Sequence, residues 1–301
     1  MDDILLTRTL RDQGFDDREL RRMRRDGTLL PVRRGAYVRE RPAERTRDDQ
    51  HRELVFATAL QLPDAAVISH GSAAVLHGLP IWPTAIDRVH VTRNRNSGGN
   101  RRAVVHVHAA PLTERDMTTI DGVSVTSLAR TVLDLCRTVP IEQAVAAGDR
   151  ALALGLVRAV LEEHLAHMAR WPGTRQARRA VALLDPLSES AGESVSRVRL
   201  HEEGLPTPEL QQSIYDDHGQ FVARVDFCWQ EHRTIGEFDG KIKYGRMLKS
   251  GQSVEDVLFA EKRREDALRD LGCQIVRWLW ADLYRRGVIR DRVLRTFARS
   301  V

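Results

Sequence analysis

Apolar and polar residues alternate along residues 221–229, a period of two that predicts a β-strand with one apolar face. Asp226 leaves that apolar face, because successive side chains of a strand point to opposite sides. The polar residues 230–233 predict a turn, and in the strand that follows Glu237 and Asp239 share one side. A tight hairpin would therefore bring the three carboxylates close together.

The period of two residues of strands and the period of about 3.6 residues of helices divide the whole chain into three regions. We expect domains over residues 1–45, 46–186 and 187–301, the middle one a mixed α/β block, so that the whole chain is an α/β (α+β) protein. Helical spacing of apolar residues predicts helices over residues 4–14, 16–25, 54–60, 72–77, 128–136, 141–154, 157–168, 175–184, 188–203, 254–271 and 281–300. Further strands are predicted over residues 88–92, 103–108, 210–215 and 274–279, with a small hairpin over 29–38.

The first region contains two predicted helices and a short basic hairpin. Asp16 and Glu19 have the spacing of a capping box, in which each side chain accepts from the other residue's backbone N–H. Helix, helix and basic hairpin is the order of a winged helix-turn-helix, whose second helix enters a major groove while the wing contacts phosphates. The side chains expected to contact DNA are Arg18, Arg21, Arg22, Arg25, Arg33 and Arg34. A basic helix pair that only faces solvent is the alternative.

Charge and cysteine usage limit the partners and the compartment. The 301-residue chain has a formal net charge of +5 and an isoelectric point of about 9.4, which favours a polyanionic partner, although a general preference for arginine would also raise the isoelectric point. Cys136, Cys228 and Cys273 have no zinc or disulfide spacing, as in a reducing compartment. Neither a signal peptide nor a membrane-length apolar run is visible, so we expect a cytoplasmic protein without a membrane partner.

Lysine is confined to one part of this arginine-rich chain. All four lysines, Lys241, Lys243, Lys249 and Lys262, follow the acidic hairpin. An ammonium group is a compact point charge that a guanidinium does not copy, and it can orient a water or neutralise a phosphate. Clustered carboxylates repel one another unless a cation offsets them, and hard oxygen ligands suit Mg²⁺ or Mn²⁺. The hairpin therefore predicts a divalent-cation site.

Two more carboxylates lie on the apolar side of the predicted helix over residues 254–271. Glu261 and Glu265 fall on that side when a turn takes about 3.6 residues. Carboxylates on an apolar helix face are costly unless they have a compensating partner or a functional role. They either belong to the site or form structural salt bridges to Arg264, Lys262 or an arginine of a strand.

Five histidines of the middle region raise the question of a second metal site. They are His70, His77, His90, His106 and His108. No cysteine or acidic residue lies at a recognisable zinc spacing from them. We therefore expect half-buried histidines or phosphate contacts.

The C-terminal pattern resembles the PD-(D/E)XK nuclease superfamily, and within it the very-short-patch-repair-like endonuclease domains. The residues that carry this likeness are Glu193 on a leading helix, Asp226, Glu237 with Asp239, and a terminal pattern that runs from Glu261-x-x-Arg264 through Leu268 and Gly272 to Arg277-Trp278. The earlier part is similar to the type IV abortive-infection antitoxin family, through Ser69-His-Gly-Ser-Ala-Ala74, Gly78-Leu-Pro80, His90-Val-Thr92 and Val125-Thr-Ser-x-x-Arg130-Thr-Val-x-Asp134.

The nuclease resemblance implies residue roles. Asp226, Glu237, Glu193 and Asp239 would be the catalytic metal ligands for Mg²⁺ or Mn²⁺, Lys241 would steer the attacking water, and Lys243, Glu261, Arg264 and Glu265 are secondary candidates. The superfamily has lysine two residues after the glutamate, where this chain has Asp239. Either Asp239 joins the ligands and a nearby lysine supplies the charge, or the site is altered and inactive.

Two functions follow from the resemblances. The first is a DNA-binding, magnesium-dependent endonuclease in phage defence or DNA repair. The second is a non-catalytic DNA-binding regulator or antitoxin, in which the nuclease fold serves as a scaffold. DNA is the partner in both, a homodimer is compatible with both, and a cognate toxin would be a partner only in the second.

Overall fold

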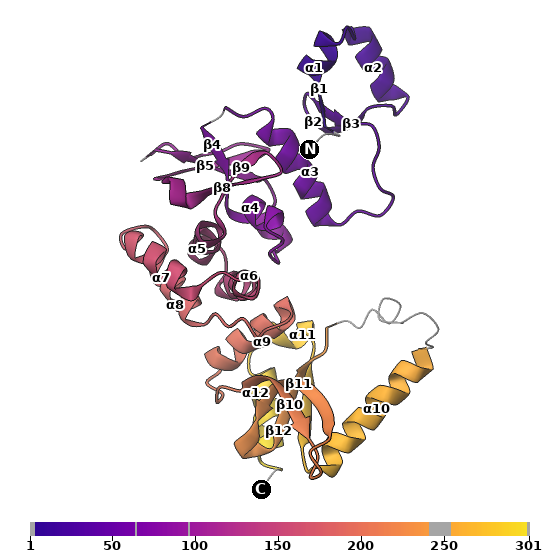
Figure 1. Cartoon of the computed structure of the whole chain (residues 1–301), viewed down its shortest axis with the longest axis vertical. Helices are drawn as coiled ribbons and strands as arrows, with labels where there is room; N and C mark the ends of the chain where they lie inside the picture. Colours follow the sequence, from indigo (N-terminus) through magenta and orange to yellow (C-terminus); the bar gives the residue numbers. More distant parts are fainter. Residues whose placement is uncertain (1–3, 64, 96, 241–253, 300–301) are drawn as a thin grey trace. The chain divides into compact units, whose positions relative to one another are not determined.

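Two compact units make up the chain, Met1–Ala182 and Leu183–Val301, and Figure 1 labels their elements. The computed structural model describes residues 4–63, 65–95, 97–240 and 254–299. Within these ranges the chain combines helices with a three-stranded, a four-stranded and a six-stranded sheet. The predicted mixed α+β class is confirmed at this level.

The first unit begins with a small antiparallel sheet and two helices. These are β1 (Leu5–Leu6), α1 (Thr7–Asp12), α2 (Asp17–Arg25), β2 (Leu30–Arg33) and β3 (Ala36–Val38), with the strand order β1-β3-β2. The helix predicted from residue 4 is wrong in its first turn, because Leu5 and Leu6 pair with β3 instead. The capping box of α2 is confirmed: Asp16 and Glu19 exchange backbone-to-carboxylate bonds of 2.8 and 2.9 Å.

Apolar and polar contacts join this region to α3 (Arg47–Ala59). One cluster, Leu10, Leu20, Leu29 and Tyr37, holds the first two helices on the small sheet. A second cluster, Leu6, Ala36 and Ala57, reaches α3. At the hairpin tip, Arg33 Nη1 donates to Thr58 Oγ1 at 2.6 Å, and Gln61 Nε2 donates to the carbonyl of Arg34 at 3.1 Å. The hairpin is therefore fastened to the end of α3.

A six-stranded sheet forms the centre of the first unit. Its strands are β4 (Ala66–Ile68), β5 (Val89–Asn94), β6 (Asn100–Arg101), β7 (Val105–Ala110), β8 (Met117–Ile120) and β9 (Val123–Thr126), in the order β6-β7-β5-β4-β9-β8. β5 and β7 run parallel, with His90 opposite His106 and Thr92 opposite His108. The valines that alternate with these residues point to the other face and join the apolar core. The sheet therefore has a valine face and a face that carries histidines.

The remaining helices of the first unit follow the strands in sequence. They are α4 (His70–Leu76), α5 (Leu128–Thr138), α6 (Ile141–Ala153), α7 (Arg158–His167) and α8 (Thr174–Ala182), with the short turns η1 (Pro83–Ala85) and η2 (Glu114–Asp116). The helices α5 to α8 pack on one another (Figure 1). In α5 the buried Asp134 accepts from Arg130 Nε at 3.0 Å and from Arg137 Nη1 at 2.9 Å. A buried carboxylate requires such partners because it has lost its hydration.

The second unit has the element order helix, three strands, helix, strand and two C-terminal helices. Its elements are α9 (Ala191–Glu202), β10 (Glu209–Tyr215), β11 (Phe221–Trp229), η3 (Gln230–His232), β12 (Thr234–Phe238), α10 (Val254–Asp270), β13 (Gln274–Trp278), α11 (Trp280–Leu283) and α12 (Val288–Phe297). The sheet order is β10-β11-β12-β13, antiparallel except for the parallel pair β12 and β13. The single helix predicted over residues 281–300 is wrong, because the chain breaks at Gly287, whose φ of +78° favours glycine.

Burial follows the alternation predicted for β11. Ala223, Val225 and Phe227 are buried, whereas Phe221 at the start of the strand is exposed. Leu268 of α10 packs on this strand in the same apolar cluster and is fully buried, so that α10 is fastened to the sheet. No described helix combines the length and the apolar character that a membrane crossing requires.

We predict that Leu268→Ala destabilises the second unit by about 2–5 kcal/mol, because truncating a buried leucine loses transfer energy and leaves a cavity. Leu294→Ala is the matched control, since this leucine is 46% exposed and its truncation should change stability by less than about 0.5 kcal/mol. Urea unfolding of both variants measures the difference. Equal free energies of unfolding would contradict the assignment of Leu268 to the core.

Candidate functional site

The β11–β12 hairpin brings Asp226 and Glu237 together. Phe227 pairs with Gly236 and Cys228 with Ile235, so the next position of the register sets Asp226 against Glu237. The backbone N–H of Phe238 donates to Asp226 Oδ2 at 3.0 Å. The hairpin therefore has the arrangement that the alternation of residues 221–229 predicted for these two carboxylates.

Glu193 approaches the same carboxylates from the first turn of α9. Its side chain accepts from the backbone N–H of Glu189 at 2.9 Å, from Ser190 Oγ at 2.7 Å and from Gln211 Nε2 at 2.9 Å. The residue is only 8% exposed. Glu193 is therefore held by neutral donors, and among the described residues it forms no ion pair.

Burial and nearby negative charge raise the pKa of Asp226 to about 6. Loss of hydration is the main cause, and the carboxylates of Glu193 and Glu237 add repulsion. The N–H of Phe238 and the charge of Arg264 act in the opposite direction. Desolvation and like charge therefore both favour the protonated form of Asp226.

Glu237 differs from the other two because arginines neutralise it. Arg264 Nη2 lies 2.8 Å from Glu237 Oε1, and Arg277 Nε lies 2.8 Å from Oε2. Arg264 also pairs with Glu261 at 2.6 Å, and the hydrogen bond to that carboxylate is the main cause that raises the Arg264 pKa above its usual value. Arg277 pairs with Glu261 at 2.9 Å and with Glu265 at 2.6 Å.

The sequence left open whether Glu261 and Glu265 belong to the site or form structural salt bridges, and the structure shows both in ion pairs. They pair with Arg264 and with Arg277, an arginine of a strand. The parallel register sets Glu237 directly opposite Arg277. Sequence reasoning gave Arg277 no role, although it belongs to the terminal pattern that carries the nuclease resemblance.

The remaining predicted residues follow β12. The backbone N–H of Asp239 donates to the carbonyl of Trp278 at 2.9 Å, which holds the end of β12 beside β13. Asp239 is half-buried. Lys241 and Lys243 lie outside the described residues.

In the first unit, the predicted DNA-contacting arginines divide into two kinds. Arg18, Arg21, Arg22 and Arg25 of α2 are exposed and form no ion pair within the described ranges, and their spacing of three and four residues places them on one side of the helix. Arg34 is exposed at the hairpin tip. Arg33 is instead partly buried against Thr58, so it also supports the fold.

Among the described residues, the group of three side chains arranged to hold a metal ion consists of histidines: His70, His90 and His108. His90 Nδ1 and His108 Nε2 lie 3.0 Å apart, and the rings of His70 and His108 stack at 3.6 Å. Burial lowers the pKa of all three, to about 4 for His90, and their mutual repulsion adds to this effect. Sequence reasoning predicted half-buried histidines or phosphate contacts here, and no local spacing indicated that these three would meet.

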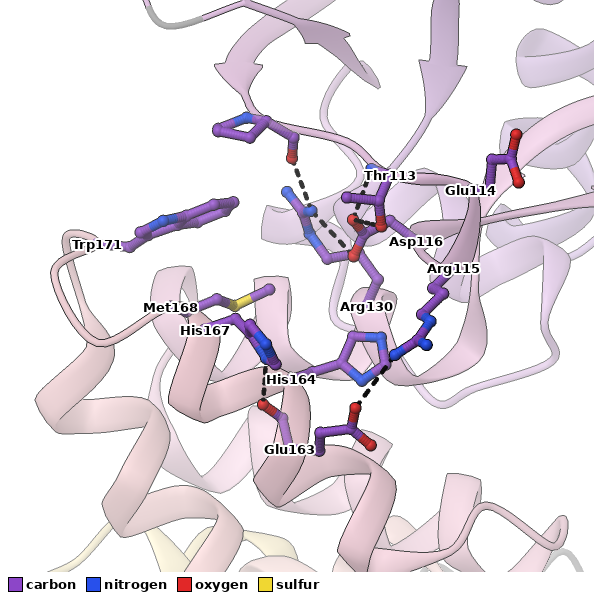
Figure 2. Close-up of a pocket in the computed structure, with 11 residues that line it drawn as sticks. Thr113, Glu114, Arg115, Asp116, Arg130, Glu163, His164, His167, Met168 and Trp171 are labelled. Atoms are coloured by element: carbon purple, nitrogen blue, oxygen red, sulfur yellow. Dashed lines mark hydrogen bonds and ion pairs between the residues drawn. The ribbon is translucent and has the colours of Figure 1, made fainter.

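A cavity of about 610 Å³ lies between η2, α5 and α7 (Figure 2). Arg130 lines it with a side chain that is 1% exposed; its Nη1 donates to the carbonyl of Pro111 at 3.0 Å and lies 3.4 Å from Asp116 Oδ1. The guanidinium carbon lies 4.8 Å from the ring centre of Trp171, a cation–π contact. His164 and His167 of α7 also line the cavity. Arg130 therefore ties together three segments of the cavity wall.

Comparison with known proteins gives relatives without an assigned function. No protein family model matches the chain. "Uncharacterized protein Rv2248" and "Uncharacterized protein MT2308", both from strains of Mycobacterium tuberculosis, are each 26% identical over 255 residues, which cover 80% of this chain and 89% of the relative. A crystal structure of the RV2827C protein from Mycobacterium tuberculosis aligns with a TM-score of 0.41 and 14% identity, over 71% of this chain and 83% of that one.

The raised pKa of Asp226 predicts a pH dependence of stability. The folded-state pKa of about 6 lies above the ordinary 3.8, so the folded state holds more protons than the unfolded state between these values. Stability from this group is present below about pH 4 and is lost as the pH rises through about 6. In the Asp226→Asn variant, the free energy of unfolding should therefore decrease by about 1–3 kcal/mol less than in the parent protein as the pH rises through this range.

Urea unfolding in EDTA across this pH range measures the effect. Asp270→Asn, a change at an exposed carboxylate at the end of α10, should keep the pH dependence of the parent protein. A pH dependence of stability that Asp226→Asn leaves unchanged would contradict the raised pKa assigned to Asp226.

Proposed function

We propose that the chain binds DNA through a winged helix-turn-helix in its first unit and hydrolyses phosphodiester bonds, with Mg²⁺ or Mn²⁺, at the carboxylates of its second unit. The observation that carries the proposal is the position of Glu193 near Asp226, where its charge acts on the second carboxylate. Glu193 is buried and Asp226 is half-buried, the charge of Glu193 raises the pKa of Asp226, and neither carboxylate has a guanidinium partner among the described residues.

The topology of the second unit adds support. Helix α9, strands β10 to β12, helix α10 and the parallel strand β13 follow the order that the nuclease resemblance implies. The acids occupy the first turn of α9 and the paired positions of β11 and β12. Support for this part of the proposal therefore comes from both the element order and the positions of the acids.

The donor set fits a hard divalent ion, because it consists of carboxylate oxygens. Asp226 and Glu193 would hold the ion, joined by Glu237 once it leaves Arg264 and Arg277, and by Asp239. The ion would supply a polarised water and charge stabilisation at phosphorus. Arg264 and Arg277 keep Glu261 and Glu265 as partners and remain close enough to offset phosphate charge. Lys241 is proposed to orient the nucleophile.

A regulator without catalytic activity is the second candidate. The observation that favours it is the complete pairing of Glu237 by two arginines, together with the absence of these acids from the three-ligand group found among the described residues. Under this alternative the second unit is a scaffold or a surface for a second copy or a cognate toxin. DNA binding by the first unit is common to both candidates.

The nuclease proposal predicts metal-dependent nicking of plasmid DNA. The parent protein should nick supercoiled plasmid in Mg²⁺ or Mn²⁺, and Asp226→Ala should lower the rate by at least about 100-fold, because removal of a metal ligand disables both water activation and charge stabilisation. Asp270→Asn should cut at the parent rate. An electrophoresis time course of the three proteins measures this. If the parent protein leaves duplex, single-stranded and branched DNA intact while still binding DNA, the regulator is the function that remains.

The DNA-binding proposal predicts a salt-dependent contribution from α2. Arg22→Ala should weaken binding to duplex DNA and lower the slope of log affinity against log salt by about 0.9, the value for one phosphate contact. Arg295→Ala, which removes an exposed arginine of α12, should leave both quantities unchanged. Fluorescence anisotropy at several salt concentrations tests this, and an Arg22→Ala slope equal to that of the parent would exclude the α2 contact.

A further inference from the structure

Three histidines from three elements meet on the polar face of the six-stranded sheet. His70 opens α4, His90 lies in β5 and His108 in β7, and one ring nitrogen of each lies within 4.8 Å of the others. We propose that His70, His90 and His108 bind a divalent transition-metal ion, with Zn²⁺ as the first candidate. This site is independent of the proposed nuclease function, because it lies in the other unit and offers nitrogen instead of oxygen ligands.

The donor type selects the class of ion. Imidazole nitrogen suits zinc, copper, nickel and iron, whereas Mg²⁺ and Mn²⁺ prefer oxygen. Three histidines with one open position form the ligand set of zinc sites that keep a water molecule. The two units would therefore select different ions from the same solution.

The spacing of the ring nitrogens fits coordination. Two ligands of a tetrahedral zinc ion, each at about 2.0–2.1 Å from the metal, lie about 3.3 Å apart. His90 Nδ1 and His108 Nε2 are 3.0 Å apart, close to one edge of such a tetrahedron. The ring of His70 is stacked on that of His108 with an interplanar angle of 13°. Because the lone pair of an imidazole nitrogen lies in the ring plane, His70 must rotate for its nitrogen to join the same ion.

The hydrogen bonds within the histidine cluster do not satisfy every buried ring nitrogen. The contact between His90 and His108 uses a single proton, whichever ring donates it. In both cases His90 Nε2 stays buried with no hydrogen-bond partner in the described part of the chain. An ion bound by His90 Nδ1 and His108 Nε2 would replace the shared proton as the link between the two rings, while His90 Nε2 would carry the remaining proton of its ring.

Neighbouring groups orient His70. Its backbone has a φ of +51°, a conformation that is uncommon for a residue other than glycine and that is typical of functional sites. Ser69 Oγ lies 3.0 Å from His70 Nδ1, and Asp134 Oδ2 lies 3.9 Å from the same nitrogen. Such outer partners fix the ring orientation and the tautomer of a ligating histidine.

Metal analysis of protein that carries no histidine tag tests the proposal. We expect about one equivalent of zinc per chain after growth with zinc. The double variant His90→Gln, His108→Gln should lose it. His167→Gln should retain the metal, because His167 lies on α7 and contacts the carbonyl of Glu163. Metal content equal in the double variant and the parent would overturn the proposal.

A second measurement on the parent protein covers the case in which the double variant does not fold. EDTA-treated protein titrated with Co²⁺ should give the visible absorption of tetrahedral cobalt that saturates at one equivalent, and Zn²⁺ should displace it and raise Tm. Imidazole ligation in the X-ray absorption spectrum of the zinc-loaded protein supports the site. Absence of saturable binding, or ligation by oxygen alone, would overturn it. The Asp226→Ala variant should bind zinc as the parent protein does. Failure of the nuclease proposal can therefore be distinguished from failure of the zinc-site proposal.

Discussion

The ion pairs of Glu237 set the charge balance around the acidic hairpin of the second unit. Arg264 and Arg277 each take one of its carboxylate oxygens, while Asp226 and Glu193 accept hydrogen bonds from neutral donors. Because both arginines also contact Glu261, they would keep a partner if Glu237 turned toward a cation. Sharing of this kind lowers the cost of the exchange, since no guanidinium would be left buried and unpaired.

Features set by neighbours in the sequence were predictable. The capping box of Asp16 and Glu19 depends on a spacing of three residues, and it forms with the expected contacts. The hairpin that joins Asp226 to Glu237 depends on a period of two and a short polar turn, which also act locally. The α+β class follows from the same periodicities.

Features set by distant segments were not predictable. Leu5 and Leu6 have the apolar character of a helix start, but β3 offers them a partner strand. The pairing of Arg277 with Glu237 depends on a parallel register across 40 residues. The meeting of His70 with His108 depends on the strand order β7-β5-β4, which no local spacing encodes.

Helix α3 contacts both the N-terminal hairpin and the region of the six-stranded sheet. Near its C-terminus Thr58 accepts the hydrogen bond of Arg33 from the basic hairpin. Nearer its N-terminus His51 Nε2 lies 2.8 Å from Ser72 Oγ, and that hydroxyl accepts from the backbone N–H of His90. A tilt of this one helix would displace the basic hairpin and the histidine cluster at once. Contacts along these thirteen residues therefore couple the position of the hairpin to the position of the strand that carries His90.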